Sequence, residues 1–288
     1  MSPSPIVVGY DRSVEAKLAA AWALDEAART GAAVEFLYAY EWPEWLPAAS
    51  MVPATSVWPD TATDHAIKQA LDEAVATALS THPDVRTKIS LLHNSAALAL
   101  IDRSAHAGLV VVGSRGHSAV TNLLGSVSTA LTARAQCPVI VVRGEPSPTA
   151  PVVVGVDDSP SSHTALVFAA GEAAARNVPL RIVRAWTPVT GLWAGTPMET
   201  RTVLESERHA FDELVATWRQ KYPNLPITAE AVVDHPANAL IEASKTAQLL
   251  VVGTRGRGSV RAMLLGSVSQ HLLRNAACTV AVAHDREV

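Results

Sequence analysis

The chain alternates between short apolar runs and longer segments in which apolar residues recur every three or four positions. In the first half, the apolar runs cover residues 6–8, 34–38, 88–92, 109–112 and 139–142. Runs of this length that end at a turn are typical of buried parallel strands, and the wider spacing is typical of helices packed on a sheet. The pattern therefore predicts an α/β fold in which helices cover both faces of a parallel sheet.

The helices of the first half are predicted at residues 14–30, 64–81, 96–107 and 126–135. In the first of these, Leu18, Ala19, Trp22 and Ala23 are expected to form the face that packs on the sheet. Gly31 then fits the left-handed position that commonly ends a helix. The first helix is thus predicted with both an inner face and a defined end.

The second half repeats this order of strands and helices. Its apolar runs cover residues 152–154, 180–184, 227–233, 249–252 and 280–283. A long helix is predicted at residues 199–222, and another begins at residue 236. Residues 144–150 are short, polar and rich in proline, which is typical of a linker. The chain is therefore expected to form two tandem domains, residues 1–143 and 151–288.

Length and composition agree with two folded domains. The chain has 288 residues, enough for two domains of about 140 residues each. Hydrophobic residues make up 49% and charged residues 17%, which predicts a globular chain with ample core. The net charge is −4 and no basic run or basic-aromatic stripe occurs, so a nucleic-acid partner is not expected.

The sequence carries no clear signal for a signal peptide, a membrane-spanning segment or a metal site. The first residues lack a basic segment followed by a long apolar run, and no segment approaches the roughly 18 apolar residues of a membrane span. Cys137 and Cys278 occupy equivalent positions in the two halves and are expected to be buried thiols in a reducing cytoplasm. The histidines do not cluster at metal-binding spacing, so no metal site is expected.

A glycine motif follows the fourth predicted strand of each half. In the second half it reads Gly253, Gly256, nine further residues, and then Gly266 and Ser267 at the start of a helix. Ser267 is expected to be the N-cap of that helix. A glycine loop beside a helix N-terminus directs free backbone N–H groups to one place, where phosphate binds well. The alternative is a glycine-rich turn that only joins two packed elements.

The first half carries the same motif with one residue fewer. Gly113 and Gly116 are followed by eight residues before Gly125 and Ser126. A shorter loop would tighten or tilt a phosphate cradle. The first-half site is therefore expected to differ from the second-half site.

Two features together resemble the universal stress protein family in its tandem two-domain form. One is the glycine motif, and the other is the turn Gly-x-Asp-x-Ser after the first strand of each half, at residues 9–13 and 155–159. The resemblance covers nearly the whole chain. It implies an adenine-nucleotide alpha-hydrolase-like fold with a five-stranded parallel sheet in the order 3-2-1-4-5. Strands 1 and 4 then flank the point where ligands bind in such sheets.

Family members that keep the glycine motif resemble ATP binders, and the resemblance therefore implies ATP as the ligand. In the second half the implied contacts are Asp157, Ala185, Trp186, Gly253, Gly256, Gly266, Ser267, Val268 and Ser269. In the first half they are Asp11, Ala39, Tyr40, Gly113, Gly116, Gly125, Ser126, Val127 and Ser128. The glycines and the helix start would hold phosphates and ribose, the aspartate would lie near ribose and adenine, and the end of the second strand would meet adenine. Arg255, Arg257 and Arg261 are placed to add positive charge beside the phosphates.

Three functions remain open from the sequence. The favoured one is a cytoplasmic ATP-binding module of the stress response, and the second is a slow ATPase or alpha-hydrolase. The ATP-binding loop Gly-x4-Gly-Lys-Ser/Thr is absent, no lysine lies within either motif, and Arg261 replaces the third glycine of a dinucleotide fingerprint. Asp157 and Asp158 are candidates for magnesium, although carboxylates at a helix start more often serve the helix itself. No catalytic residue is therefore assigned.

The third function is a nucleotide-free interaction protein. Residues 41–59 form a long predicted loop, which favours a lid or an interface. Tryptophans lie in or near this loop and its second-half counterpart, at Trp42, Trp45, Trp58, Trp186 and Trp193. They are expected to cover the crevice rather than recruit a partner.

The family resemblance also implies how the two halves associate. The fifth strands, residues 139–142 and 280–283, would pair edge to edge into an intramolecular pseudo-dimer and cover exposed sheet edges. A homodimer of the whole chain is a further possibility.

Overall fold

The computed structural model describes residues 3–39, 61–116, 124–144, 147–187, 197–257 and 264–284. Contacts divide the chain into a first unit, residues 1–120 and 125–142, and a second unit that contains residues 143–288. The predicted loop at residues 41–59 lies outside the described residues, as do Tyr40, Trp42, Trp45, Trp58, Trp193 and Arg261.

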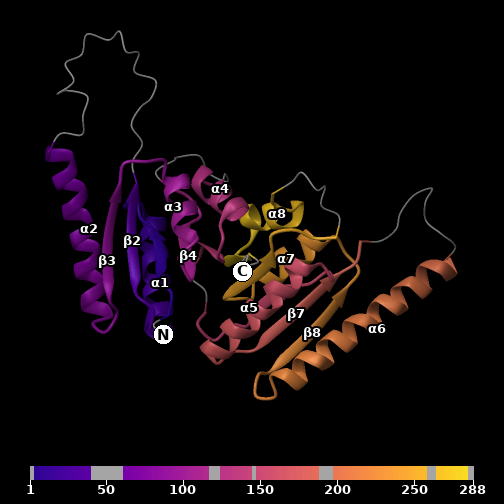
Figure 1. Ribbon diagram of the computed structural model, residues 1–288. Coiled ribbons are helices and arrows are strands. Elements are labelled where there is room, and N and C mark those ends of the chain that lie inside the picture. The colour runs from indigo at the N-terminus through magenta and orange to yellow at the C-terminus, as the bar shows by residue number, and fades with distance from the viewer. Residues whose placement is uncertain are drawn as a thin grey trace, which may run out of the picture. The chain divides into compact units, whose positions relative to one another are not determined.

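The first unit is a five-stranded parallel sheet with four helices among its described residues (Figure 1). In chain order its elements are β1 (Ile6–Gly9), α1 (Val14–Thr30), β2 (Val34–Ala39), α2 (Thr61–Thr81), β3 (Thr87–Leu92), α3 (Ala96–Ser104), β4 (Leu109–Gly113), α4 (Ser126–Arg134) and β5 (Val139–Val142). The strand order is β3-β2-β1-β4-β5, and each neighbouring pair is parallel. The predicted strand order is confirmed.

The second unit repeats this arrangement. Its elements are β6 (Val152–Gly155), α5 (Pro160–Arg176), β7 (Leu180–Ala185), α6 (Pro197–Lys221), β8 (Ile227–Val232), α7 (Pro236–Ser244), β9 (Leu249–Gly253), α8 (Ser267–Asn275) and β10 (Thr279–Ala283). The strand order is β8-β7-β6-β9-β10, again parallel throughout. The first and fourth strands of each unit are therefore neighbours, and their carboxyl ends lie side by side at one edge of the sheet.

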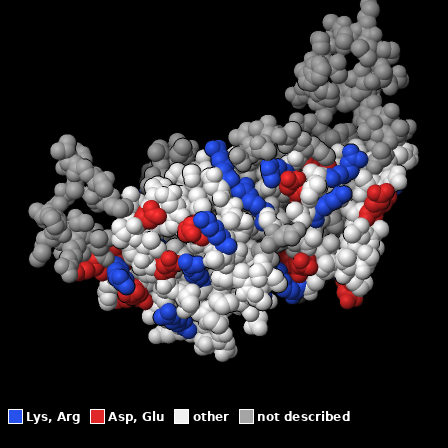
Figure 2. Space-filling view, turned by 180° about the vertical axis from the view of Figure 1, so that it is seen from behind, with Lys and Arg blue, Asp and Glu red and all other residues white. Residues whose placement is uncertain are grey.

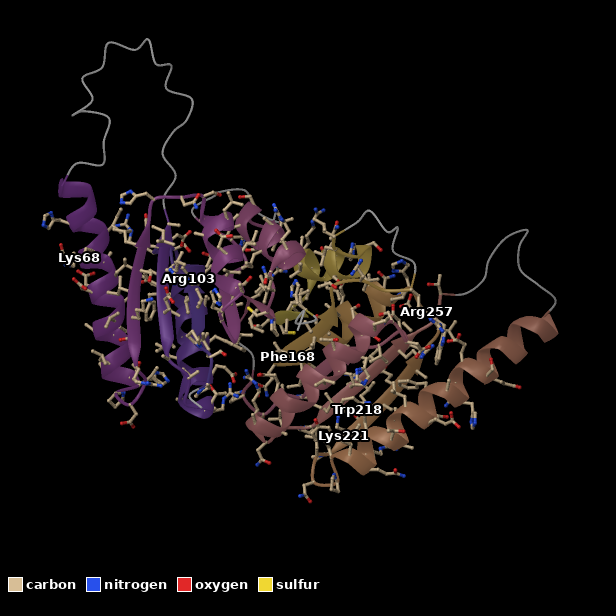
Figure 3. The ribbon with its side chains drawn as sticks, viewed as in Figure 1. Lys68, Arg103, Phe168, Trp218, Lys221 and Arg257 are labelled. Carbon is tan, nitrogen blue, oxygen red and sulfur yellow. The ribbon has the colours of Figure 1, made fainter. Side chains whose placement is uncertain are left out.

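Helices cover both faces of each sheet. In the first unit, Asp25 of α1 forms a 3.0 Å hydrogen bond with His82, the residue that follows α2. Helices α3 and α4 pack against each other (Figure 1). In the second unit His163 of α5 packs edge-on against Trp218 of α6, with ring centroids 6.0 Å apart, and α7 packs on α8. Figure 3 shows Trp218 and Lys221 together near the end of α6, where the Lys221 amine lies 4.8 Å from the Trp218 ring centroid.

The inner face of α1 consists mainly of alanine, together with Leu24. Ala19 and Ala23 are fully buried, as predicted, but Leu18 is 37% exposed and does not belong to the inner face. Leu18 lies about 200° around the helix from the buried Ala16, at the roughly 100° per residue of an α-helix. The small inner residues allow the helix to lie very close to the sheet, since a Cβ at Gly113 would come within 2.6 Å of the Glu15 Cβ.

The end of the third helix differs from the prediction, whereas the burial of the cysteines agrees with it. The third helix ends at Ser104 rather than at residue 107, because the Ser104 hydroxyl turns back to the Ile101 carbonyl and also accepts the Gln136 N–H. Both cysteines are buried, as predicted, and burial raises the pKa of the Cys278 thiol to about 12. Among the described helices, none is long and apolar enough to cross a membrane.

Charges on the surface are mixed rather than segregated. On the face shown in Figure 2, basic and acidic side chains of the described residues lie interspersed over both units. This distribution agrees with the small net charge of −4.

The fold predicts opposite effects for one substitution at two exposed glycines. Gly31 ends α1 in the left-handed conformation with φ of 71°, whereas Gly171 lies inside α5, and a Cβ at either position would meet nothing within 4 Å. Gly31→Ala should therefore destabilise the protein by about 1 kcal/mol, and Gly171→Ala should stabilise it by about 1 kcal/mol. Urea unfolding of the full chain measures both, and equal effects of the two substitutions would contradict this account.

Candidate functional site

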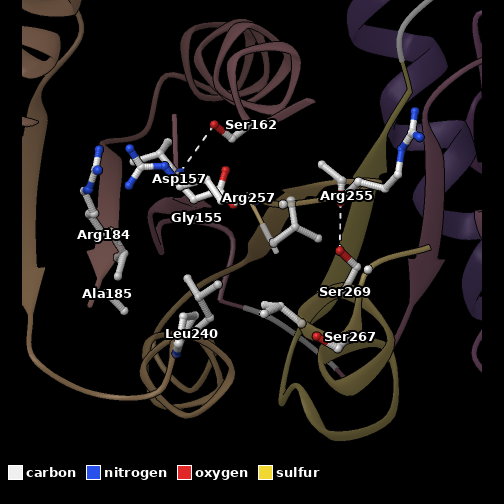
Figure 4. A pocket seen from close by; sticks show the side chains of 18 of the residues that line it. Gly155, Asp157, Ser162, Arg184, Ala185, Leu240, Arg255, Arg257, Ser267 and Ser269 are labelled. Carbon is white, nitrogen blue, oxygen red and sulfur yellow. Dashed lines mark hydrogen bonds between the residues drawn. The ribbon is translucent and has the colours of Figure 1, made fainter. Parts of the chain in front are cut away.

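A cavity of about 430 Å³ opens at the carboxyl ends of the second unit's strands (Figure 4). It is formed by the ends of β6, β7 and β9, the first turn of α7, and the start of α8. Its volume is in the range of small-molecule sites. The lining residues include Gly155, Val156, Asp157, Val183, Arg184, Ala185, Trp186, Leu240, Gly253, Arg255, Gly256, Arg257, Gly266, Ser267, Val268 and Ser269.

Asp157 ties the turn after β6 to the glycine loop after β9. One carboxylate oxygen accepts the Ser159 N–H at 3.1 Å and the Ser159 hydroxyl at 2.6 Å. The other oxygen accepts the N–H of Arg257 at 2.9 Å. A Cβ at Gly256 would collide with this carboxylate, so the loop can approach Asp157 only with glycine there. Asp157 thus acts on the protein's own backbone and positions the loop.

Further contacts hold the glycine loop against the sheet and the helices. The Ser269 hydroxyl donates to the Gly253 carbonyl at 2.8 Å, and the Gly266 N–H donates to the Thr254 carbonyl at 2.7 Å. A Cβ at Gly253 would lie 2.5 Å from the Ser161 carbonyl oxygen of α5. The backbone of the glycine loop, which lines the cavity, is therefore held by a hydrogen bond from α8 and by close packing on α5.

The start of α8 is capped by glycine, which corrects the prediction of Ser267 as the N-cap. Gly266 is the N-cap, Ser267 is the first helical residue, and no side chain among the described residues caps this helix. By contrast, the Ser13 and Ser159 side chains cap α1 and α5. The first-turn N–H groups of α8 therefore remain for another acceptor, since a helix cannot satisfy them internally.

Gly266 is not required by the backbone or by its neighbours. Its φ of −68° and ψ of 154° are open to any residue. A Cβ there would find its nearest described neighbours at 3.4 Å, the Arg255 Cα and the Thr254 carbonyl oxygen. These are ordinary contacts, so a side chain is sterically allowed at Gly266. Gly266 nevertheless lines the cavity directly before the helix N-terminus, which is the form of a cradle for an anion.

A cluster of two arginines and two carboxylates lies beside the cavity, and its two arginines, Arg184 and Arg257, line it. Arg184 of β7, whose side chain is only 2% exposed, pairs with both oxygens of Asp158 and with Glu207 of α6. Arg257 of the glycine loop binds both Glu207 oxygens at 3.1 Å and Asp158 at 3.0 Å. The Trp186 indole also donates to Glu207, at 3.1 Å. Asp158 reaches this cluster from a left-handed backbone with φ of 63°.

These contacts perturb the ionisation of two members of the cluster. Burial opposes the charged form of Glu207, but the hydrogen bonds from Trp186, Arg257 and Arg184 outweigh it and lower the pKa of this carboxyl. Burial likewise opposes the charge on Arg184, and Asp158 and Glu207 together raise the pKa of its guanidinium. The cluster pairs two basic side chains with two acidic ones, so its formal charges balance.

The first unit has a corresponding cavity of about 290 Å³. Asp11 accepts the Ser13 N–H at 2.9 Å, Ser128 donates to the Gly113 carbonyl at 2.9 Å, and Gly125 is the N-cap of α4 without a side-chain cap among the described residues. Tyr10 also lines the cavity, and burial followed by the Asp11 charge raises the pKa of its hydroxyl. The loop-to-turn geometry is thus repeated in the smaller cavity.

The charged cluster is not repeated in the first unit. Arg12 follows Asp11 in the first unit, just as Asp158 follows Asp157 in the second. Tyr38 is the fifth residue of β2, and Arg184 is the fifth residue of β7. Counting back from the prolines at 83 and 223 that follow the second helices, Ile67 stands where Glu207 stands. The two cavities therefore share a cradle and differ in the charge beside it.

All predicted contact residues that the structure describes line one of the two cavities. In the second unit these are Asp157, Ala185, Trp186, Gly253, Gly256, Gly266, Ser267, Val268 and Ser269. In the first unit they are Asp11, Ala39, Gly113, Gly116, Gly125, Ser126, Val127 and Ser128. Sequence reasoning missed Arg184 and Glu207. Their only signals were an arginine near the end of a strand that also contains Arg181, and a glutamate on a polar helix. Within the described residues no three His, Cys, Asp or Glu side chains come together as a metal site.

The geometry predicts that Glu207 contributes to the loss of stability in acid. Because its carboxyl pKa is lower in the folded protein, the unfolded chain takes up more protons as the pH falls. The Glu207 contribution is therefore complete above its ordinary pKa of 4.5 and is lost as the pH falls below it. Glu207→Gln should flatten the decline in urea stability between about pH 6 and pH 3.5. Glu213→Gln, which removes an exposed carboxyl of the same helix, is the control, and an unchanged acid slope in Glu207→Gln would contradict the assignment.

Comparison with known proteins agrees with the two repeated units. The universal stress protein family matches the chain twice, at residues 4–143 and 149–284. Two universal stress proteins of Mycobacterium tuberculosis are 34% and 36% identical to it, over 96% and 97% of this chain and 96% of each relative. One of Mycolicibacterium smegmatis is 35% identical over 98% of this chain and 97% of its own length. The fold is shared with a universal stress protein crystal structure from Archaeoglobus fulgidus, with a TM-score of 0.69 and 18% identity, covering 99% of this chain and 97% of that one. With two matched repeats that span almost its whole length, the chain belongs to the universal stress protein family.

Proposed function

We propose that this protein is an ATP-binding module with one nucleotide site in each domain, residues 1–143 and 151–288. The observation that carries the proposal is the open cradle before α8, where Gly266 is required neither by its backbone angles nor by its neighbours. An uncapped helix N-terminus beside fixed backbone is a site for phosphate. Arg255 lines the cavity and adds positive charge there, and Arg257 also lines it while paired with Glu207 and Asp158.

The rest of the cavity suits a nucleoside. Val156, Val183 and Leu240 line it beside the carboxyl ends of β6 and β7 and on α7, and they offer an apolar surface for a base. The backbone at Ala185 and Trp186 lies at the edge of the same surface, where polar backbone groups would select adenine. The combination of an apolar pocket and a phosphate cradle supports a nucleotide over a simple anion.

Binding is favoured over hydrolysis by the state of the carboxylates. Asp157 is engaged by Ser159 and by the Arg257 N–H, and Asp158 by the Arg184 and Arg257 side chains. A nucleotide hydrolase needs a carboxylate placed to hold magnesium or to orient water. Asp158 would have to break its ion pairs with Arg184 and Arg257 before it could hold magnesium or orient water. A slow ATPase, with magnesium held by Asp157 and Asp158, is therefore the second candidate.

The wider role is proposed from family membership. We propose that the module acts in the cytoplasm in a stress response, with nucleotide occupancy as its signal. Edge pairing of residues 139–142 with 280–283 and assembly of the chain into a homodimer stay predictions. Chemical crosslinking and light scattering of the purified protein test them.

The first experiment identifies nucleotide carried by the purified protein. Freshly purified chain is denatured, and the released material is identified by chromatography and related to the amount of protein. We expect ATP at a ratio between one and two per chain, with the second unit filled first because its cavity is larger. Release of ADP alone would favour the ATPase, and a chain that neither carries nor takes up ATP would overturn the proposal.

The cradle itself is tested by substitutions at Gly266. Gly266→Asp should abolish ATP binding in the second unit, because it places a carboxylate where phosphate is proposed to lie. Gly266→Asn, which has the same shape without the charge, should weaken binding less, and both should fold because the backbone angles allow any residue. Calorimetry in a chain that also carries Gly125→Asp isolates the second unit. Undiminished ATP affinity in Gly266→Asp would count against the cradle.

A further inference from the structure

The side chain of Arg257 has two possible kinds of hydrogen-bond acceptor, the carboxylates of Glu207 and Asp158 and a phosphate of a bound nucleotide. Its residue lines the proposed nucleotide site, and its backbone N–H is held by Asp157, so the side chain starts from a fixed point (Figures 3 and 4). Its guanidinium binds Glu207 and Asp158, yet the side chain remains 54% exposed. A half-exposed arginine on a fixed backbone can turn from these carboxylates to a phosphate without moving the loop.

Because Arg184 also binds Asp158 and Glu207, Arg257 can break its ion pairs without leaving either carboxylate unpaired. Arg184 pairs with Asp158 and with Glu207 at the same time, and it is the member of the cluster that is fully enclosed. If Arg257 turns away, each carboxylate keeps one cationic partner, and Glu207 also keeps the Trp186 indole N–H. The cost of releasing Arg257 is therefore that of a partly exposed ion pair and not that of an unpaired buried ion.

We propose that Glu207 is a specificity-determining residue of the second site, which competes with the phosphates of a bound nucleotide for Arg257. The inference rests on the proposed function and concerns how much the phosphates add to affinity. A ligand that recruits Arg257 must displace Glu207, whereas a nucleoside leaves this contact intact. Glu207 therefore lowers the affinity for polyphosphates selectively and leaves recognition of the nucleoside unchanged.

The first unit lacks this competitor. Ile67 replaces Glu207, Tyr38 replaces Arg184 and Arg12 replaces Asp158 at the corresponding positions. In the first unit the loop arginine that lines the cavity is Arg115, and it lies 3.6 Å from a different carboxylate, Glu15. The two sites of one chain should respond differently to the number of phosphates on the ligand.

Calorimetric titration with adenosine, ADP and ATP tests the proposal in the chain carrying Gly125→Asp. Glu207→Gln should bind ATP about three- to fivefold more tightly, ADP with a smaller gain, and adenosine with no change. Glu213→Gln removes an exposed carboxyl that lies elsewhere on α6 and pairs with His209, and it should change none of the three affinities. This control separates local competition from a general reduction of negative charge.

A double-mutant cycle identifies the group for which Glu207 competes. Arg257→Ala should weaken ATP binding and leave adenosine unchanged, and Glu207→Gln should produce no gain when Arg257 is already alanine. If Glu207→Gln does not fold, Glu207→Asp keeps the charge but shortens its reach, and a smaller gain for ATP is expected.

Each alternative outcome decides against a defined part of the proposal. Equal weakening of all three ligands by Glu207→Gln would mean that Glu207 only supports the fold of the site. Unchanged ATP affinity, or a gain that persists without Arg257, would overturn the competition. If the chain with an intact second site binds neither adenosine nor ATP, the proposed function itself fails, and this inference fails with it.

Discussion

The second site depends on one interaction, between the aspartate after the first strand of its unit and the glycine loop after the fourth. In a parallel sheet of this order the first and fourth strands are neighbours, so the two loops leave the same edge side by side. Asp157 accepts backbone N–H groups from both loops, at Ser159 and at Arg257. The carboxylate thereby joins residues about a hundred positions apart into a single wall. Ser269 and Ser161 hold the start of the glycine loop, and the bond to Asp157 fixes the loop further along, at Arg257.

The glycines of the motif serve two different purposes, which the motif alone does not separate. Gly253 is demanded by the protein, since α5 packs against it too closely for a Cβ. Gly266 is not demanded by the protein, and yet its position before an uncapped helix is the one that a phosphate would need. A substitution at Gly253 therefore acts first through packing, whereas one at Gly266 acts first through the ligand. Loss of binding at Gly253 alone would thus say little about function.

Local features were predictable from the sequence, and features that join distant elements were not. The apolar runs and glycine turns locate the strands to within a residue or two, and the family resemblance supplies their order. The prediction of Ser267 as the N-cap was wrong because serine is the better capping residue in isolation, but helix α8 begins one residue earlier than that preference suggests, with Gly266 as its N-cap. Leu18 was assigned inward by its hydrophobicity, although the buried side of α1 is formed by its alanines and Leu24, and Leu18 lies on another side of the helix. The cluster around Glu207 joins a turn, a strand, a long helix and the glycine loop, and no local pattern brings those four together.

Comparison of the two units separates what the fold requires from what it permits. Both units keep the aspartate, the glycines and the serine that bonds the glycine carbonyl, because these residues shape the backbone of the cradle. The charges beside the cradle differ, because Arg184 and Glu207 stabilise each other and can be replaced together by Tyr38 and Ile67 without changing that backbone. A single one of these replacements would be costly, since Arg184 is enclosed and would lose a partner. Among the described residues this cluster lies beside the second cradle, and it gives the two sites a means of differing in affinity while the fold stays the same.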